Sequence, residues 1–534
     1  MLNTRQPILF YSVDYDNVIA VSATNSSDVL ADFSSRGAEV VVSAPGDNIF
    51  STLPNYVFYY DTACGFNQSY DYMSGTSMAA PHVSDLAELV LSMNSSLTPL
   101  QVRTIIELSS EDLSPTGIDT LYGYGRINAY NTLLNTPIIV NLSTAQFLEG
   151  GSGGTYEVTG VNVGSSWGGT AYYGQTIKAN PPGGWSFYQW SDGSTANPRT
   201  ITQTLNIYAI YKGIHKSNDA TAFSNNSQRK FVRTQDGWLH QVYVSAGRVW
   251  LEHSSDDGTD WFLGNNGLPL DNGEGKCPSI DWVHYYYYNS SQGTYVHEYI
   301  IVAAYQQKYG NYYKIRYAVF KKVNDVYVNN TPNGSDATLY TESSDLYSVD
   351  ANPNIAISQC LSGVYDFIVS FERKSGSTAG VNWFYGKMSN GGVCPTYQNY
   401  VGPVWIDGTN ASSVNASVHL NKGIVNPGES FDIVYQQGTQ YIKDVILSCT
   451  YNGVGNWTTY QSEPFTISQS TDRKSYKPSL VQKINCHISV SWIRDRIGGS
   501  APYAINAVNW DSENSSVYRT YGAWDVRPIK SKIV

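Results

Sequence analysis

One serine in this sequence stands out as a residue that could do chemistry. Ser77 lies in MSGTSMAAPHV (73–83), where small residues lead into an apolar pattern of helical period. The first turn of a helix has backbone N–H groups without partners and the positive end of the helix dipole. Such groups can stabilise an oxyanion, and Gly75 allows a substrate backbone to approach closely. Ser77 is therefore a candidate nucleophile; the alternative is that Thr76 or Ser77 is only an N-cap.

Two strands and two helices should position this serine. VIAVSA (18–23) and EVVVSAP (39–45) are β-branched runs, typical of strands that a parallel sheet buries on both faces. The helix that begins at Ser77 should end near 94–96, and its apolar stripe predicts a buried face. That stripe consists of Val83, Leu86, Ala87, Val90 and Leu91. TPLQVRTIIELSS (98–110) predicts a second helix with proline in its first turn. This segment should be α/β.

Linked motifs in this segment resemble the subtilases, the subtilisin-like serine proteases. GTSMAAPHV (75–83) resembles their nucleophile motif, and VVVSAPGDNIFSTLP (40–54) resembles their V-x-A-P-G-x-x-I-x-S-T segment. YGYGRINA (122–129) resembles the motif that closes their catalytic domain. The resemblance covers residues 10–135 and implies that Ser77 is the acylating nucleophile and that its own N–H is one oxyanion donor. It implies no cofactor and no metal at the site.

The groups that would activate Ser77 are not recognisable in this sequence. Acyl transfer needs a histidine base and an orienting carboxylate. In subtilases these lie upstream of the serine, in D-[ST]-G and H-G-T-H motifs, together with an asparagine that donates to the oxyanion. None of the three occurs in the 534 residues. We therefore expect a truncated portion of a protease that is inactive alone; the alternatives are a pseudo-enzyme or a piece that complements its other half.

Three polar residues close to the serine receive non-catalytic roles. His82 follows Ser77 by five positions and should lie on a different face of the same helix, as a structural residue. Asp61 and Asp71 precede the serine on a loop, and without an imidazole between them they are expected to be solvated acids.

The composition is typical of a secreted β protein. Charged residues make up 14%, well below the usual quarter, while 43 Tyr and 46 Gly favour strands and turns. A net charge of −11 argues against a nucleic-acid partner, and no apolar run predicts a membrane span. The full-length parent is expected outside the cell, although no signal peptide is recognisable at Met1. Six cysteines without CxxC spacing do not indicate zinc and leave disulfide pairing open.

A change in charge predicts a domain boundary near residue 135. Residues 1–135 hold 14 acidic side chains against four arginines, a net of −10, whereas residues 136–534 hold 30 acidic and 29 basic side chains. We therefore expect a multidomain chain. Its parts are a partial α/β subtilase domain with a parallel sheet (1–135), a small all-β module (136–213) and a β-propeller-like domain (214–534).

The small module ends in a tryptophan-rich stretch. PPGGWSFYQWSDGSTANPRTITQTLNIYAIYKG (181–213) resembles the Trp-Ser-Asp-Gly β-repeat modules of bacterial surface proteins. Trp185, Tyr188 and Trp190 are expected to form its compact core, with glycan binding as the alternative.

The last part of the chain repeats. A first strand recurs as CPSIDW (277–282), NPNIAI (352–357), NASVHL (415–420) and KPSLVQ (477–482), each followed by two more apolar strands. Another unit fits 229–265. Repeats of this length, each a small antiparallel sheet, predict a β-propeller of five to six blades.

One turn in the first repeat has a recognisable pattern. SSDDGTDW (254–261) resembles the Asp-box turn of sialidase-like propellers. Asp256 should bond to the backbone and Trp261 should pack underneath. Arginine is too sparse to assign a sialidase site, so a structural role is expected.

Two functions from different classes fit these observations. The first is a secreted serine endopeptidase that acts on proteins or peptides. The second is a non-catalytic binding protein that carries a protease remnant and recognises a glycan or another cell-surface ligand. The reading frame upstream of Met1 discriminates between them, because the first requires the D-[ST]-G and H-G-T-H motifs and a signal peptide there.

Overall fold

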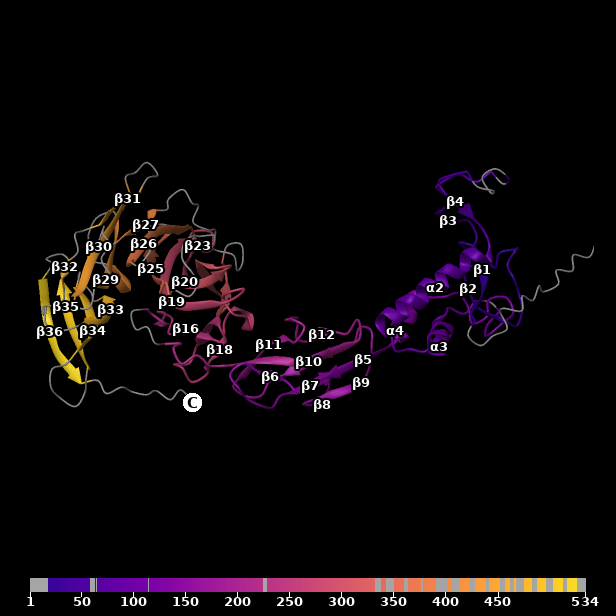
Figure 1. Cartoon of the computed structure of the whole chain (residues 1–534), viewed down its shortest axis with the longest axis horizontal. Coiled ribbons are helices and arrows are strands. Elements are labelled where there is room, and N and C mark those ends of the chain that lie inside the picture. Colours follow the sequence, from indigo (N-terminus) through magenta and orange to yellow (C-terminus); the bar gives the residue numbers. More distant parts are fainter. Residues whose placement is uncertain are drawn as a thin grey trace, which may run out of the picture. The chain divides into compact units, whose positions relative to one another are not determined.

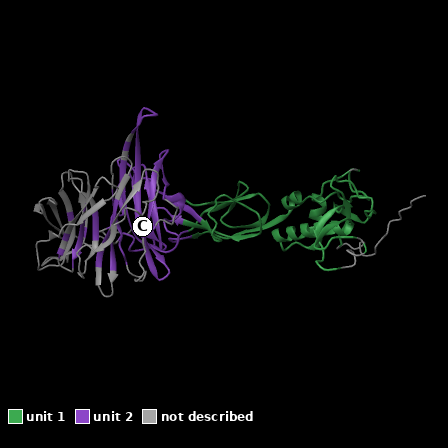
Figure 2. Cartoon of the chain, turned by 90° about the horizontal axis from the view of Figure 1, so that it is seen from above, with its two compact units in different colours: residues 1–146, 152–182, 189–211 green, residues 147–151, 183–188, 212–534 purple. Residues whose placement is uncertain are grey.

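The computed structural model forms two compact units (Figure 2). Unit 1 comprises residues 1–146, 152–182 and 189–211, and unit 2 comprises residues 147–151, 183–188 and 212–534. The structure describes residues 18–57, 63, 65–113, 115–223, 228–331, 338–341, 350–359, 364–375, 378–389, 401–405, 413–421, 428–437, 441–451, 457–461, 465–466, 475–482, 487–495, 503–511 and 516–525. The boundaries expected after residues 135 and 213 stay predictions.

Unit 1 begins with an α/β part that contains Ser77. Strands β1 (Ala20–Thr24) and β2 (Val40–Pro45) pair in parallel, and both are almost wholly buried, as their β-branched composition predicts. The helices of this part are α2 (Thr76–Met93), α3 (Pro99–Ser109) and α4 (Ala129–Asn135), which Figure 1 labels. Apolar side chains from β1, β2, α2 and α3 form one core cluster. The expected parallel strands and both expected helices are confirmed.

The buried face of α2 differs in one residue from the predicted stripe. Val83, Leu86 and Val90 are buried as expected, and Ala79 and Met93 extend this row. Leu91 is 38% exposed, so its assignment to the buried face is wrong. It follows Val90 by one position, which turns its side chain about 100° away from the row on a 3.6-residue helix.

Short strands make up the rest of unit 1. They form three small sheets, in the strand orders β12-β10-β7-β8, β11-β14-β6 and β13-β5-β9. Three of these strands, β6, β11 and β14, also contribute residues to unit 2. The bounds are β5 (Pro137–Leu142), β6 (Gln146–Phe147), β7 (Thr155–Val158), β8 (Val161–Gly164), β9 (Trp167–Tyr172), β10 (Thr176–Asn180), β11 (Trp185–Trp190), β12 (Arg199–Thr200), β13 (Leu205–Ile207) and β14 (Ala209–Gly213).

The aromatic residues of β11 pack as core residues. Trp190 is fully buried, its ring lies 6.0 Å from that of Tyr156, and its Nε1 donates to the Ala196 carbonyl at 2.8 Å. Trp185 meets the Phe147 ring edge-on at 4.6 Å, and Tyr188 is half-buried. The expected core role is confirmed for Trp190.

Unit 2 contains five antiparallel sheets in its described part, and each is built from strands that follow one another along the chain. The bounds are β15 (Phe231–Arg233), β16 (Leu239–Ser245), β17 (Arg248–Ser254) and β18 (Phe262–Leu263); then η2 (Asn265–Gly267); β19 (Gly275–Asn289), β20 (Thr294–Tyr309), β21 (Tyr312–Val323), β22 (Val326–Asn329) and β23 (Thr338–Thr341); β24 (Asn354–Gln359), β25 (Val364–Ser375), β26 (Thr378–Ser389) and β27 (Val401–Trp405); β28 (Ser413–Asn421), β29 (Gly428–Gln437), β30 (Tyr441–Tyr451), β31 (Trp457–Gln461) and β32 (Phe465–Thr466); and β33 (Ser475–Gln482), β34 (His487–Asp495), β35 (Tyr503–Asp511) and β36 (Ser516–Asp525).

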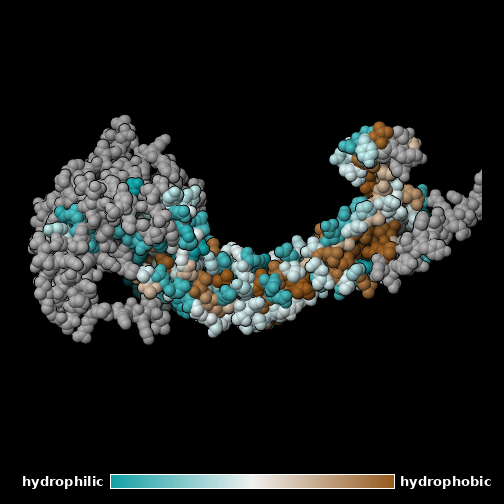
Figure 3. Space-filling model, viewed as in Figure 1, coloured by the Kyte–Doolittle hydropathy of each residue, from teal (hydrophilic) through white to brown (hydrophobic). Residues whose placement is uncertain are grey.

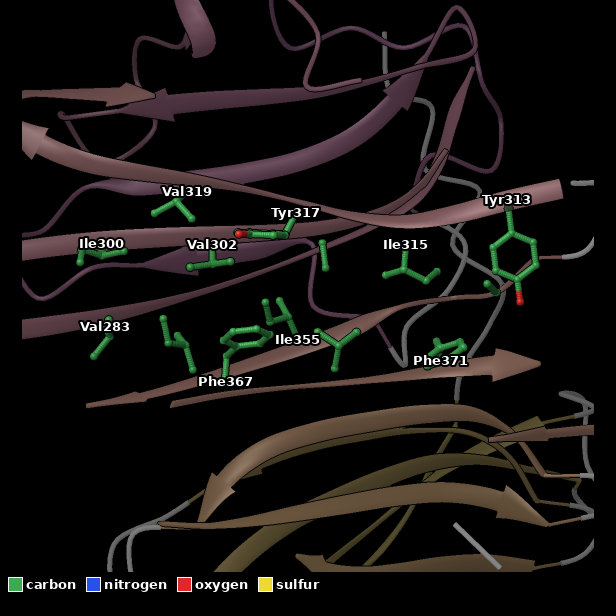
Figure 4. Close-up of a cluster of buried hydrophobic side chains, with 14 residues drawn as sticks. Val283, Ile300, Val302, Tyr313, Ile315, Tyr317, Val319, Ile355, Phe367 and Phe371 are labelled. Carbon is green, nitrogen blue, oxygen red and sulfur yellow. The ribbon is translucent and has the colours of Figure 1, made fainter. Parts of the chain in front are cut away.

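Consecutive sheets of unit 2 pack face to face. Alternate residues of a strand point to opposite faces, so a strand with apolar residues throughout can serve two neighbours. In β20, Ile301 and Ala303 join a core cluster with the first sheet, whereas Ile300 and Val302 join one with the third. Figure 4 shows the second of these clusters between the two sheets. A similar cluster joins the third and fourth sheets.

Side chains also link the first strands of neighbouring sheets. The backbone N–H of Ile355 in β24 donates to the Ser279 hydroxyl of β19 at 3.2 Å. The N–H of Ile357 donates to the Asp281 carboxylate at 3.0 Å, and Asn354 donates to the Ala416 carbonyl of β28 at 3.2 Å. The stack is thus fixed by polar contacts as well as by apolar burial.

A buried polar network holds connecting segments of unit 2 on its first sheet. The Lys212 ammonium lies 2.8 Å from the Glu149 carboxylate and 3.2 Å from the Tyr243 hydroxyl, and the lysine side chain is fully buried. Tyr243 donates to the buried Glu252 at 2.5 Å, and Glu252 also accepts the His215 N–H at 2.6 Å. Burial opposes ionisation of Glu252, but these hydrogen bonds outweigh burial and lower its pKa. Burial lowers the pKa of Lys212, and Glu149 opposes that effect.

No helix in the described part of the chain is long and apolar enough to cross a membrane.

Candidate active site

Ser77 is the second residue of α2 and is exposed to solvent. The preceding Gly75 has an extended backbone, and no side chain caps the helix. The Met78 N–H donates to the Gly75 carbonyl at 2.9 Å, whereas the N–H groups of Thr76 and Ser77 keep their hydrogen-bonding capacity for a ligand. Within the residues that the structure describes, the Ser77 hydroxyl has no hydrogen-bond partner. A carbonyl group placed at this turn would meet both a hydroxyl oxygen and backbone donors.

The loop after β2 holds the start of α2 in place. The N–H of Gly75 donates to the Gly46 carbonyl at 2.8 Å. The Ser74 hydroxyl donates to the Asp47 carboxylate at 2.8 Å and accepts the Asn48 N–H at the same distance. Three residues before the nucleophile, the chain is thus tied to the V-x-A-P-G-x-x-I-x-S-T segment. The sequence motifs marked both segments, but not the hydrogen bonds that join them.

An aromatic hairpin leads into the site. Strands β3 (Ile49–Thr52) and β4 (Tyr70–Met73) pair in antiparallel fashion, and β4 ends three residues before α2 begins. The Phe50 ring lies 4.8 Å from that of Tyr72 and 5.8 Å from that of Tyr70, and all three side chains are exposed. The sequence analysis did not predict this hairpin, because both strands are short and face solvent.

The structure does not bring the His82 side chain to Ser77. His82 is half-buried, and its Nδ1 lies 3.1 Å from the carbonyl oxygen of Met78 on the same helix. The helical contact of His82 agrees with the structural role expected from the sequence.

Pro81 lies inside α2 and has no N–H group. The Ser77 carbonyl therefore lacks its usual helical hydrogen-bond partner, which is tolerated this close to the start of a helix.

Asp71 is engaged by its own loop. Its carboxylate accepts the N–H groups of Asn67 at 2.6 Å and of Tyr72 at 2.8 Å, and these bonds lower the pKa of Asp71. It therefore stays ionised and bound to the backbone rather than solvated alone. Asp61 lies outside the described residues. No group of three or more metal-ligand side chains occurs in the described part of the chain.

Comparison with known proteins assigns this part of the chain. Residues 6–125 match the family model described as "Subtilase family". The thermophilic serine proteinase of Bacillus sp. (strain AK1) is 40% identical over 131 residues, which cover 24% of this chain and 29% of that protein. Thermitase of Thermoactinomyces vulgaris is 37% identical over 123 residues, 23% of this chain and 38% of that protein. A solved lanthipeptide protease matches 22% of this chain and 42% of that chain at 28% identity, with a TM-score of 0.20.

The uncapped start of α2, with Ser77 in its first turn, lies inside the segment that matches the subtilase family model. Residues 6–125 are similar to the subtilase family, which confirms the resemblance seen in the motifs. The chain spans roughly a third of the length of these curated relatives.

A substitution at Gly46 should disturb the nucleophile helix. A Cβ atom there would lie 2.7 Å from the Ala23 Cβ and 2.9 Å from the Gly75 carbonyl oxygen, and the latter belongs to the backbone and cannot rotate away. We expect Gly46→Ala to lower the stability of this part by about 1–3 kcal/mol through overpacking. Hydrogen exchange at the first turn of α2 should be faster than in the wild type.

Gly183→Ala is the matched control. An added Cβ at Gly183 meets nothing within 4 Å, so hydrogen exchange and melting should stay close to those of the wild type. Unchanged protection of α2 in Gly46→Ala would show that the loop after β2 does not hold the helix start.

Proposed function

We propose that Ser77 is the acylating nucleophile of a serine endopeptidase whose base, orienting carboxylate and second oxyanion donor come from a further polypeptide segment. The observation that carries this proposal is the exposed Ser77 hydroxyl at the uncapped start of α2, inside a segment of the subtilase family. The hydroxyl attacks the carbonyl of a peptide bond, and the Ser77 N–H donates to the oxyanion that forms. The leaving amine takes up the proton from the supplied histidine.

The surface of the α/β part supports a missing neighbour. Leu89 on α2, Leu100 and Leu108 on α3, and Tyr130 on α4 are all exposed. Brown apolar side chains gather over the helical part of unit 1 in Figure 3. Parallel sheets are normally covered on both faces and have more than two strands, and exposed apolar clusters mark surfaces that a partner covers. The proposed partner is the part of a subtilase domain that carries the aspartate, the histidine and the asparagine.

The proposed substrates are proteins or peptides, and the proposed location of the full-length protein is outside the cell. No cofactor takes part in this chemistry. The low charge and high tyrosine content are typical of secreted β proteins.

We further propose that the five sheets of unit 2 are the blades of a β-propeller-like domain. The support is the order of strands within each sheet and the face-to-face packing of consecutive sheets. The turn at Asp256 behaves as a structural element, because its carboxylate accepts the Ser254 hydroxyl at 2.8 Å and the Asp260 N–H at 3.0 Å. Trp261 donates to the Gly258 carbonyl at 3.0 Å beneath this turn.

A complementation experiment tests the proposed activity. The preceding catalytic segment of thermitase, joined before Met1, should give a protein that hydrolyses casein and a chromogenic peptide. The chain alone should do neither and should not react with a fluorophosphonate probe, because no imidazole contacts the Ser77 hydroxyl in the residues that the structure describes. Labelling of Ser77 in the chain alone would contradict the need for a second segment. A fusion that folds and stays inactive would favour a non-catalytic binding protein.

A further inference from the structure

The hairpin of β19 and β20 extends beyond the rest of its sheet. Most residues of β20 from 300 to 307 pair with both β19 and β21, whereas residues 294–299 pair only with residues 284–289 of β19. Among the described strands, none lies on either edge of this outer half. It is therefore a two-stranded ribbon.

One face of the ribbon is lined by aromatic rings. The register places His284 opposite Tyr299, Tyr286 opposite His297, and Tyr288 opposite Tyr295. Residues two apart on a strand share a face, so all six side chains project from the same side. Three of them are strongly exposed: Tyr286 at 56%, Tyr288 at 57% and Tyr295 at 62%. Exposed rings in a continuous row are unusual on a protein surface and indicate a binding face.

The two imidazoles lie side by side in one plane. Their ring centroids are 5.1 Å apart and their planes differ by 4°, while His284 Nε2 lies 2.9 Å from His297 Nδ1. Rings stacked face to face would keep their atoms about 3.5 Å or more apart, so the short distance excludes stacking. Tyr286 lies 6.0 Å from each imidazole and is inclined by 26° and 30° to them. The three rings thus form a platform in which the two imidazoles share a plane and the Tyr286 ring is inclined to them, while Tyr299 stacks on His284 at 4.6 Å.

The surroundings of the platform hold no unpaired cation in the described residues close to it. Lys321 pairs with Glu298 at 2.6 Å, and Lys322 pairs with Asp236 at 2.8 Å. Burial and the neighbouring His297 lower the pKa of His284, which keeps its imidazole neutral at pH 7. The rim of the platform carries phenol hydroxyls and imidazole nitrogens, which can donate and accept hydrogen bonds.

We propose that this face of the β19–β20 ribbon binds a neutral oligosaccharide. A sugar ring has an apolar C–H face, which packs on a flat aromatic ring, and a rim of hydroxyl groups, which pair with phenols and imidazoles. A nucleic acid would need unpaired lysine or arginine beside the rings. A purely apolar protein partner would bury the phenol and imidazole groups without hydrogen bonds. Ring pairs across the strands also stabilise the ribbon, but that role does not require exposed ring faces.

The test measures retention of the full-length chain on insoluble chitin, cellulose and starch, in a Ser77→Ala background that excludes proteolysis. Its outcome is therefore separate from that of the proposed peptidase activity. The wild-type ribbon should be retained on at least one of these polysaccharides. Tyr286→Ala and His297→Ala should each weaken retention about tenfold, whereas Tyr286→Phe, which keeps the ring, should weaken it much less.

Tyr312→Ala is the matched control, because Tyr312 is an exposed tyrosine of the same sheet outside the ribbon. It should leave retention unchanged, and circular dichroism of all variants should match that of the wild type. Absence of retention on all three polysaccharides would overturn the proposal. So would retention that Tyr286→Ala and His297→Ala do not change, or preferential binding of single-stranded DNA.

Discussion

Ser77→Ala is expected to abolish the peptidase activity of the protein complemented with the missing catalytic segment. Alanine removes the oxygen that forms the acyl-enzyme, and the N–H groups at the start of α2 cannot replace it. In subtilisin, removal of the catalytic serine lowers kcat by about 10⁶-fold, and a loss of the same order is expected here. The measurement is hydrolysis of a chromogenic peptide at saturating substrate, with inhibition of the parent fusion by phenylmethylsulfonyl fluoride.

His82 provides the control for this experiment. Its contact with the Met78 carbonyl is structural, so His82→Ala should reduce stability more than it reduces the rate per folded molecule. Active-site titration corrects the rate for the folded fraction. Activity that survives Ser77→Ala would place the nucleophile elsewhere, and a collapse of kcat in folded His82→Ala would give that histidine a catalytic role.

Lys212→Met is expected to destabilise unit 2 by about 3–5 kcal/mol, the usual cost of removing one partner of a buried ion pair. Lys212 is fully buried, and its ammonium is the partner of the buried Glu149 carboxylate. Methionine matches the length of the side chain but leaves that carboxylate without a counter-charge. Hydrogen exchange of the β16 and β17 amides, measured in the full-length chain, reports the free energy of opening of this sheet.

The double variant Lys212→Met, Glu149→Gln separates charge from packing. Because it removes both charges, it should recover much of the lost stability. Equal destabilisation of the single and double variants would mean that the lysine contributes through its contacts with Trp250 and Tyr243 rather than through its charge.

Local patterns predicted the repeating parts of the fold well. CPSIDW, NPNIAI, NASVHL and KPSLVQ lie in β19, β24, β28 and β33 or overlap them, as expected of first strands. In the second and third sheets these strands, and the two that follow each, are apolar because the sheet packs on a neighbour through each face. The fourth strands, such as β18 and β22, were missed because they are short and largely exposed. Without a buried face, a strand has no apolar pattern to detect.

Only the part of the candidate site that lies within the motif at residues 73–83 could be predicted from the sequence. The stretch around Ser77 predicted the helix, which the structure confirms, and the role of Ser77 as nucleophile, which stays a prediction. The contacts that support it join residues 26 or more positions apart, such as Ser74 with Asn48, and depend on how β2 meets α2. The same limit applies to Lys212, whose partner Glu149 is 63 positions away. Two side chains that meet only in the folded structure show no periodic pattern in the sequence. Their contact therefore cannot be predicted from the sequence alone.

Each sheet of unit 2 packs on the sheets next to it along the chain. The stability of unit 2 can therefore be treated as that of a linear array of units. In such an array the free energy is close to a sum of terms for each unit and for each contact between adjacent units, and disruption can spread from an end inward. The first sheet has one neighbour along the chain and the middle sheets have two, so it should open before them if the proposed propeller does not bring the first and last sheets together. Gain or loss of one whole sheet would change the length of the array while leaving the remaining contacts intact, a change that unequal crossing-over between repeats can produce in a single step.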